Sequence, residues 1–315
     1  MILASLTVTT ITTMNTKKRL IVVVGATASG KSDLGVALAL HYHAPIISTD
    51  SRQFYRGIPI GTAQPTAEQL AAVEHHFIAN LDITTEFNCG EYEKLALIKL
   101  EELFKKHDTI VAVGGSGLYI RALCEGMDDL PEADKELRKE LSQRLAEKGV
   151  EAMAEELKAL DPEYYEQVDR NNPARVMRAL EVCLTTGQRY SDLRKGGRKE
   201  RDFQIIKVGI EMPREILYER INRRVDIMVE QGLEAEARAM LPHRACNALQ
   251  TVGYSEMFEY FDGNITFEEA VELIKRNSRR YAKRQTTWFK RDEQIGWFHP
   301  SQESEIIEYI DSQFG

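Results

Sequence analysis

The chain has 315 residues, of which 43% are hydrophobic and 29% charged, and its formal net charge is −8. These values are typical of a folded protein long enough for one large domain with an insertion. The negative net charge by itself argues against a nucleic-acid partner, but it does not show how the charge is distributed locally. The four cysteines form no C-x-x-C pair, so the sequence suggests neither a zinc knuckle nor a disulfide framework, which fits a reducing cytoplasm. No apolar run reaches membrane-spanning length, so we expect no membrane partner.

The first fourteen residues are rich in threonine and lack the basic segment that opens a secretory signal. We expect residues 1–14 to be a dispensable or disordered extension, or Met14 to be the natural start. The folded core is then expected to begin at residue 15.

A phosphate-binding loop is predicted directly after the first strand. The apolar, β-branched residues 20–24 predict a buried strand, and the apolar spacing of residues 33–40 predicts a helix. Between them lies the pattern G-x-x-x-x-G-K-[ST], in the context that confirms a P-loop. Its backbone amides, the helix N-terminus and the lysine attract phosphate, and the last hydroxyl is suited to Mg²⁺. The loop consists of Gly25, Ala26, Thr27, Ala28, Ser29, Gly30, Lys31 and Ser32.

Two further strands are expected to end near this loop. The run 45–48 leads to Asp50, and the run 109–113 leads to Gly114, Gly115 and Ser116. Ligands bind at the carboxyl ends of parallel strands, so Asp50 is a candidate to order Mg²⁺ or to accept a proton. A turn-capping role for Asp50 stays open. The two glycines suit close approach of a ligand to the backbone.

Helical segments are expected on either side of these strands. The apolar residues Leu95, Ile98, Leu103 and Phe104 predict an amphipathic helix over residues 91–106. Residues 127–201 contain no strand-like run, which predicts a helical lobe inserted into an α/β core of residues 15–126 and 202–315.

The later part of the core carries two basic helices. Strand character returns at residues 204–210, and the following helix places Arg220 and Arg224 on one face. That face is either solvated, with Glu219 as a partner, or folds over the phosphate as a lid would. Residues 275–291 hold eight basic residues, no acidic residue and interleaved aromatics, a pattern that favours a local nucleic-acid surface. Two of these aromatics, Trp288 and Phe289, are equally compatible with the core.

Taken together, the motifs resemble the tRNA dimethylallyltransferase (tRNA isopentenyltransferase) family. The resemblance rests on an ordered set that spans nearly the whole chain: the P-loop and residues 48–51, 57–63, 113–119, 171–181, 252–254 and 283–288. The sequence departs from the family at Gln64, where a lysine is usual, and at Ser116, where threonine is common. The zinc finger of the eukaryotic members is absent, so the chain resembles the bacterial type.

The resemblance implies a P-loop NTPase-like parallel sheet with flanking helices, and transfer of a dimethylallyl group from its diphosphate to N6 of adenosine 37 in tRNA. The P-loop then holds the prenyl diphosphate with Mg²⁺ at Ser32, assisted by Arg224 and by Arg220 or Arg223. Asp50 is expected to accept the amine proton, and Ser116 to position the base or the diphosphate.

The resemblance also implies that the anticodon arm is gripped by residues of both the core and the helical lobe. The family's tRNA-contacting positions match Asp50, Ser51, Arg52, Gln53, Ser116, Arg138, Ala174, Arg175, Val176, Met177, Arg178, Gln250, Gly253, Tyr254, Lys283, Arg284 and Gln285. We expect a cytoplasmic monomer. Two alternatives stay open: a P-loop kinase for a small molecule, and a non-catalytic RNA-binding protein that uses the P-loop as a switch.

Overall fold

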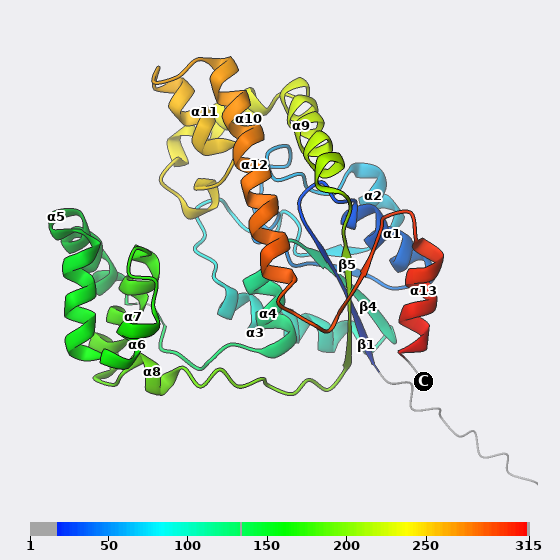
Figure 1. Cartoon of the computed structure of the whole chain (residues 1–315). Helices are drawn as coiled ribbons and strands as arrows, with labels where there is room; N and C mark the ends of the chain where they lie inside the picture. Colours follow the sequence, from blue (N-terminus) through cyan, green and yellow to red (C-terminus); the bar gives the residue numbers. More distant parts are fainter. Residues whose placement is uncertain (1–17, 133, 314–315) are drawn as a thin grey trace, which may run out of the picture. The chain divides into compact units, whose positions relative to one another are not determined.

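The core of the protein is built on one parallel sheet. The structure, a computed structural model, describes residues 18–132 and 134–313, so the expectation for residues 1–14 lies outside the described residues. The strands lie in the order β3-β2-β4-β1-β5-β6, and every pair among them is parallel (Figure 1). Their bounds are β1 Arg19–Gly25, β2 Ile46–Ser48, β3 His75–His76, β4 Thr109–Gly114, β5 Gln204–Ile210 and β6 Ile295–Phe298. The predicted α/β fold with a parallel sheet is confirmed.

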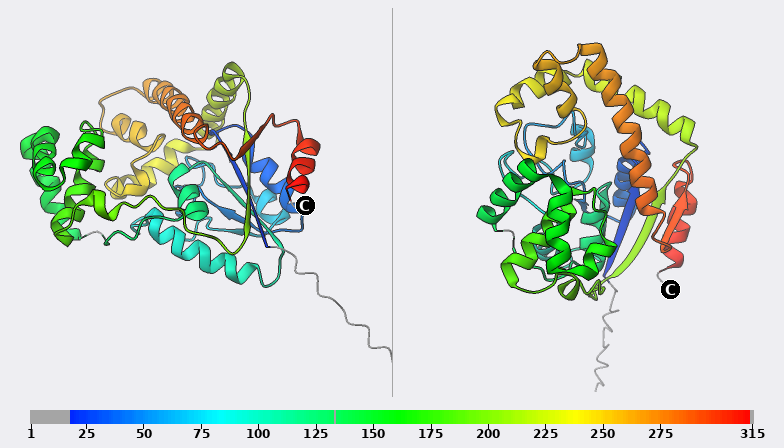
Figure 2. Two further views of the ribbon diagram at one scale, coloured as in Figure 1. Left: turned by 60° about the horizontal axis from the view of Figure 1, so that its bottom comes forward. Right: turned by 60° about the vertical axis from the view of Figure 1, so that its left-hand side comes forward.

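Helices cover both faces of this sheet (Figure 2). The core helices are α1 Lys31–His41, α2 Ala67–Ala72, α3 Cys89–Leu103, α4 Gly117–Glu125, α9 Arg214–Glu230, α10 Leu233–Met240, α11 Tyr254–Phe261, α12 Phe267–Phe289 and α13 Glu303–Ser312, with short 3-10 turns η1 Leu241–His243 and η2 Asn247–Leu249. Successive residues of β1 point to opposite faces. Its residues Val22 and Val24 pack with α3, α4 and the end of α12, whereas Ile21 and Val23 pack with α1 and α13.

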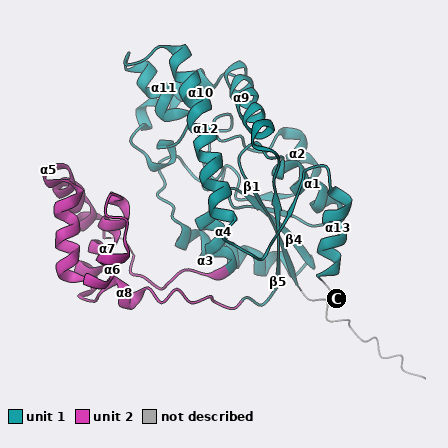
Figure 3. Ribbon diagram, viewed as in Figure 1, with its two compact units in different colours: residues 1–124, 201–315 teal, residues 125–200 magenta. Residues whose placement is uncertain are grey.

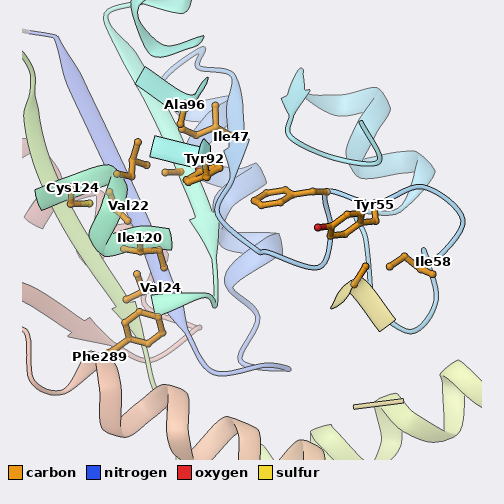
Figure 4. Close-up of a cluster of buried hydrophobic side chains, with 14 of the residues drawn as sticks. Val22, Val24, Ile47, Tyr55, Ile58, Tyr92, Ala96, Ile120, Cys124 and Phe289 are labelled. Atoms are coloured by element: carbon orange, nitrogen blue, oxygen red, sulfur yellow. The ribbon is translucent and has the colours of Figure 1, made fainter. Parts of the chain in front are cut away.

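The end of α12 belongs to this core. Phe289 is 3% exposed and shares a cluster with Val24 and Ile120, and Figure 4 shows its ring beside them. The basic helix is thereby fixed against the sheet at its carboxyl end, directly below the predicted phosphate loop. Of the two aromatic residues left open above, Phe289 is a core residue and Trp288 is 36% exposed.

The predicted amphipathic helix over residues 91–106 is present as α3, with Leu103 and Phe104 buried as expected, but the prediction was wrong for Leu95 and Ile98. The helix begins at Cys89, where Asn88 and Glu91 form a capping box, and it buries Tyr92, Ala96 and Leu100 against the sheet. By contrast, Leu95 is 47% exposed and Ile98 is 63% exposed. The apolar residues fall on two faces of this helix, and their spacing alone did not show which face meets the sheet.

Residues 125–200 form a separate compact unit, while residues 1–124 and 201–315 form the other (Figure 3). The smaller unit contains α5 Lys135–Leu160, interrupted at Gly149, followed by α6 Pro162–Gln167, α7 Pro173–Thr186 and α8 Tyr190–Leu193. None of its described residues is in a strand, which confirms the helical insertion.

A buried carboxylate ties the helices of this smaller unit together. Asp161 is fully buried, and its Oδ1 accepts the backbone N–H of Tyr164 at 3.0 Å and the hydroxyl of Ser191 at 2.8 Å. Its Oδ2 accepts the backbone N–H of Ser191 at 2.7 Å. These bonds satisfy the carboxylate and fix the start of α6 against α8. Across the described part of the chain, no helix is both long enough and apolar enough to span a bilayer.

Candidate active site

The register of the sheet brings the predicted site loops to one edge. Strand β4 lies between β1 and β2, with Gly114 level with Val24 and Val113 level with Ser48. All three strands run in the same direction, so the P-loop, the segment with Asp50 and the turn with Ser116 leave the sheet side by side. This is the edge at which open α/β sheets bind ligands.

The P-loop adopts the curled backbone that its sequence predicts. Gly30 has φ 95° and Ala28 has φ 62°, both in the left-handed region, and α1 begins at Lys31. The Lys31 side chain is buried and its ammonium donates to the carbonyl of Ala26 at 3.3 Å. The loop therefore presents a helix N-terminus and a buried cation, the combination that binds phosphate.

The charge on this lysine is sensitive to its surroundings. The pKa of Lys31 is lowered to about 8, mainly by burial; the Asp50 carboxylate opposes this shift, and the Arg224 guanidinium adds to it. Burial also lowers the pKa of Arg224, against the opposing effect of Asp50 and Asp33. Two desolvated cations next to each other favour a bound anion that would neutralise them.

The P-loop forms one wall of a cavity of about 580 Å³ within the larger unit. Its polar lining includes Thr27, Lys31, Ser32, Asp50, Arg224 and Arg284. Its apolar lining comes from α9, α10, α12 and a preceding loop, and includes Ile221, Val225, Met228, Leu233, Val252 and Ile274. A cavity with a cationic end and an apolar wall suits a ligand that has a charged head and a hydrocarbon tail.

Asp50 and Ser116 lie in neighbouring loops that are bonded to each other. The Ser116 hydroxyl accepts the backbone N–H of Ser51 at 2.9 Å and donates to the Ser51 hydroxyl at 3.1 Å. Asp50 lines the cavity, and its Oδ1 accepts the backbone N–H of Arg52 at 3.1 Å. Ser116 thus holds the segment that carries Asp50. The hydrogen bond from the Arg52 amide means that Asp50 caps a short turn, and Asp50 lines the cavity at the same time.

Both predicted arginines of α9 contact the P-loop. The Arg224 guanidinium donates to the Thr27 hydroxyl at 3.4 Å, and Nε of Arg220 donates to the carbonyl of Ala28 at 3.0 Å. Arg223, between them in sequence, is exposed and does not line the cavity. These contacts favour the lid interpretation over the solvated face with Glu219.

The sequence analysis did not name Tyr281 as a site residue. Tyr281 of α12 lines the cavity near Ser116 and Asp50. Burial and, to a smaller extent, the Asp50 carboxylate raise its pKa to about 12, against smaller lowering effects of Arg52 and Ser116. It is therefore a neutral phenol at physiological pH. The signal that could have identified it is its helical spacing from Ile274, Ser278 and Gln285, which share the cavity-facing side of α12.

Two loops near Asp50 are joined by side-chain amides. The Gln53 amide donates to the carbonyl of Ala63 at 2.8 Å, and the Gln64 amide donates to the carbonyls of Tyr55 at 2.8 Å and Gln53 at 3.2 Å. Gln64, which replaces the lysine usual in the resembled family, therefore acts as a brace between the two loops. Arg52 likewise reaches the carbonyl of Asn247.

Four residues expected to contact tRNA have buried side chains, namely Ser116, described above, and Val176, Tyr254 and Gln285. Their contact with tRNA stays a prediction. Val176 is 0% exposed within the core of the helical unit. Tyr254 is 0% exposed, and its hydroxyl donates to Glu236. Gln285 is 6% exposed and bonds to the P-loop. Val176 and Tyr254 pack inside the protein, whereas Gln285 also lines the cavity.

The remaining expected contacts are distributed over both units. Ala174 and Arg175 are exposed, whereas Arg138 and Arg178 both pair with the buried Glu181 carboxylate at 2.8 Å, and Met177 packs against the helical core. Within the larger unit, Lys283 and Arg284 are exposed, and the cavity lining includes Ser51, Arg52, Gln53, Gln250, Gly253 and Arg284.

The donors for a metal ion are few. Among the described residues, no group of three or more His, Cys, Asp or Glu side chains could hold an ion. Ser32 lines the cavity at the start of α1, beside Lys31. A hydroxyl alone is a weak site, so a divalent cation here would depend on oxygens of the ligand itself, as Mg²⁺ commonly does.

Comparison with known proteins identifies the family. Residues 53–292 match the family model described as IPP transferase. The chain is 50% identical over 293 residues to tRNA dimethylallyltransferase 1 of Phocaeicola vulgatus, covering 93% of this chain and 98% of that one. It is 49% identical over 296 residues to a tRNA dimethylallyltransferase of Cytophaga hutchinsonii, covering 94% and 97%.

A solved structure agrees with these relatives. The full-length tRNA isopentenylpyrophosphate transferase of Bacillus halodurans superposes with a TM-score of 0.70 at 38% identity, covering 95% of this chain and 97% of that chain. The fold and cavity define a P-loop transferase. The chain belongs to the IPP transferase family, whose relatives named here are tRNA dimethylallyltransferases, and the small-molecule kinase alternative is not favoured.

Proposed function

We propose that this protein transfers a dimethylallyl group from dimethylallyl diphosphate to N6 of adenosine 37 in tRNA, with release of diphosphate. The observation that supports it best is one cavity that combines the P-loop cations, an apolar wall and the Asp50 carboxylate. The P-loop cations would bind the diphosphate, the apolar wall would contact the hydrocarbon tail, and the Asp50 carboxylate would face the entering amine.

The leaving diphosphate is the first chemical requirement. Breaking the C1–O bond of an allylic diphosphate leaves a delocalised cation and places negative charge on the departing oxygens. The P-loop amides, Lys31 and Arg224 would stabilise that charge. Mg²⁺, held by Ser32 and the diphosphate oxygens, would supply further positive charge.

The adenine amine is the second requirement, because its lone pair is delocalised into the ring and it is a poor nucleophile. Asp50 would accept its N–H and take the proton as the C–N bond forms. The Ser51–Ser116 hydroxyl pair holds the Asp50 segment in place. Tyr281, neutral and adjacent, completes the wall against which the base would lie.

The target base must leave its stack in the anticodon loop to enter such a cavity. The exposed Lys283 and Arg284 of α12, together with Arg52, would contact the RNA backbone, and Arg52 and Arg284 also line the cavity. The exposed Arg175 of the helical unit is the candidate contact there. Recognition of unpaired loop bases and backbone shape would then select the tRNA.

A transfer assay tests this function. The full chain is incubated with Mg²⁺, dimethylallyl diphosphate labelled in the prenyl group and an unmodified anticodon stem-loop that carries adenosine 37. We expect label in the RNA, and none with a stem-loop in which guanosine replaces adenosine 37. Absence of label, with ATP consumed to phosphorylate a small acceptor, would instead establish the kinase.

The pKa of Lys31 predicts how diphosphate binding depends on pH. A bound anion stabilises the ammonium form, so above pH 8 binding must take up a proton, and affinity must fall as pH rises. We expect affinity for dimethylallyl diphosphate to weaken as the pH rises above about 8, where the ligand-free lysine loses its proton. Titration calorimetry across this range measures it. Lys31→Arg stays charged and should flatten the profile, and a flat profile for the unaltered protein would contradict this account.

The exposed cations of α12 predict a salt-dependent effect on tRNA. Removing Lys283 and Arg284 together should weaken tRNA binding by about tenfold or more at low salt and reduce the slope of log K against log salt by up to about two. Filter binding at several salt concentrations measures both. The matched control is Lys105→Ala, an exposed lysine outside the cavity lining. If Lys105→Ala lost as much tRNA affinity, or if the salt slope did not change, Lys283 and Arg284 would not be specific contacts for tRNA.

A further inference from the structure

The carboxyl half of α12 contains a buried glutamine, Gln285, directly after two exposed basic residues. Gln285 follows Lys283 and Arg284 directly, yet it is 6% exposed whereas both neighbours are exposed. Helical periodicity explains the contrast, because Gln285 lies on the same face as the cavity-lining Tyr281 and the buried Phe289. The adjacent residues therefore point to different surroundings.

The Gln285 side chain uses both ends of its amide. Its Oε1 accepts the backbone N–H of Thr27 in the P-loop at 2.8 Å, and its Nε2 donates to the carbonyl of Gly115 at 2.9 Å. Thr27 and Gly115 belong to the loops after β1 and β4, which carry the phosphate site and Ser116 respectively. One amide thereby joins the two site loops to α12.

The surroundings leave little freedom for another arrangement. A Cβ on Gly115 would lie 2.3 Å from Nε2 of Gln285, so the close approach depends on glycine at that position. From α9, the Arg224 guanidinium donates to the Thr27 hydroxyl and Nε of Arg220 donates to the Ala28 carbonyl. The loop is therefore fixed between α9 and α12, which pack against each other.

From these contacts we infer that Gln285 is a positioning residue of the diphosphate site and not a contact for tRNA. This inference rests on the proposed function, since it takes the P-loop ligand to be a diphosphate. By engaging the Thr27 amide, Gln285 fixes the curvature of the loop before the ligand arrives. Preorganised amides need no rearrangement when the anion binds, which strengthens binding. The tRNA-binding role on α12 is left to Lys283 and Arg284.

The test separates the two roles by measuring two ligands on the same variants. Gln285→Met fills a similar volume but removes both hydrogen bonds, and Gln285→Ala removes the side chain. We expect both variants, in the full chain, to bind magnesium pyrophosphate about ten- to hundredfold more weakly by calorimetry, with tRNA affinity and its salt slope within about twofold of the unaltered protein. In the transfer assay the KM for dimethylallyl diphosphate should rise and the KM for tRNA should not.

Lys283→Ala is the matched control, because Lys283 lies two residues before Gln285 on α12 but is exposed. For this variant we expect weaker tRNA binding and unchanged pyrophosphate affinity. If Gln285→Met bound pyrophosphate normally, or lost tRNA affinity while pyrophosphate affinity was retained, the inference would be overturned. Melting curves establish whether each variant is folded. If the unaltered protein bound no pyrophosphate, the diphosphate site of the proposed function would fail, independently of Gln285.

A second measurement needs no substitution. In the unaltered, ligand-free protein the Thr27 amide is hydrogen-bonded to a buried side chain, so its hydrogen exchange should be slow for a loop amide. Amide-resolved exchange by NMR measures it directly. Free exchange of the Thr27 amide at the rate of an exposed loop would show that the bond to Gln285 is not made and would overturn the inference even if the variants failed to fold.

Discussion

Replacing Asp50 with alanine is expected to lower kcat for prenyl transfer by about 10²–10⁴, the range usual for loss of a general base. The carboxylate lines the cavity beside Lys31 and Arg224, and in the proposed reaction it is the group that accepts the amine proton. Its removal leaves the phosphate-binding contacts of Lys31 and Arg224 in place. The KM for dimethylallyl diphosphate should therefore change much less than kcat.

Asp50→Asn is the sharper version of this experiment. The amide keeps the shape of the side chain and can still accept the backbone N–H of Arg52, but it is a far weaker base. Single-turnover transfer with saturating tRNA and diphosphate measures the chemical step for both variants. If Asp50→Asn transferred the prenyl group at the unaltered rate, Asp50 would be a loop-capping residue and another group would have to accept the proton.

Replacing Arg224 with alanine is expected to raise the KM for dimethylallyl diphosphate by about tenfold to a hundredfold, because a charged hydrogen bond in a desolvated site is lost. The guanidinium contacts Thr27 in the P-loop, and burial lowers its pKa, which is the signature of a cation held in the site. The departing diphosphate carries more charge than the substrate at the reacting oxygen, so kcat should fall as well.

Arg223→Ala is the matched control for Arg224→Ala. It removes the same charge from the next residue of α9, which is exposed and outside the cavity lining. Initial rates against dimethylallyl diphosphate, at fixed tRNA, measure the effect of each. An unchanged KM for Arg224→Ala, or equal effects of the two substitutions, would exclude a specific contact between Arg224 and the diphosphate.

The parts of the site predictable from sequence are those encoded locally. The P-loop is a contiguous motif between a strand and a helix, and Asp50 and Ser116 directly follow apolar runs that ended as strands β2 and β4. Parallel strands place such residues at one edge, so their proximity followed from the fold class alone. Helical spacing also predicted that Arg220 and Arg224 share one face of their helix. It did not predict whether that face is solvated or contacts the P-loop.

What the sequence could not provide depends on packing between distant segments. The burial of Gln285 and Tyr254 is set by elements more than a hundred residues away, the P-loop and the segment 58–61. Resemblance to a family marks such residues as important without saying which way their side chains point. The same limit explains α3, where Leu95 and Ile98 proved exposed. The edge strand β3, with two residues, is too short to leave a recognisable pattern.

The central claim is that one cavity holds the prenyl diphosphate on the P-loop and the amine of adenosine 37 at Asp50. A crystal structure of the full chain with an anticodon stem-loop, Mg²⁺ and a dimethylallyl diphosphate analogue with an unreactive C1 linkage tests it most directly. We predict phosphate oxygens against residues 25–32, and N6 of the extruded adenosine within hydrogen-bonding distance of the Asp50 carboxylate. A diphosphate bound away from the P-loop, or an adenine amine facing a group other than Asp50, would contradict the account.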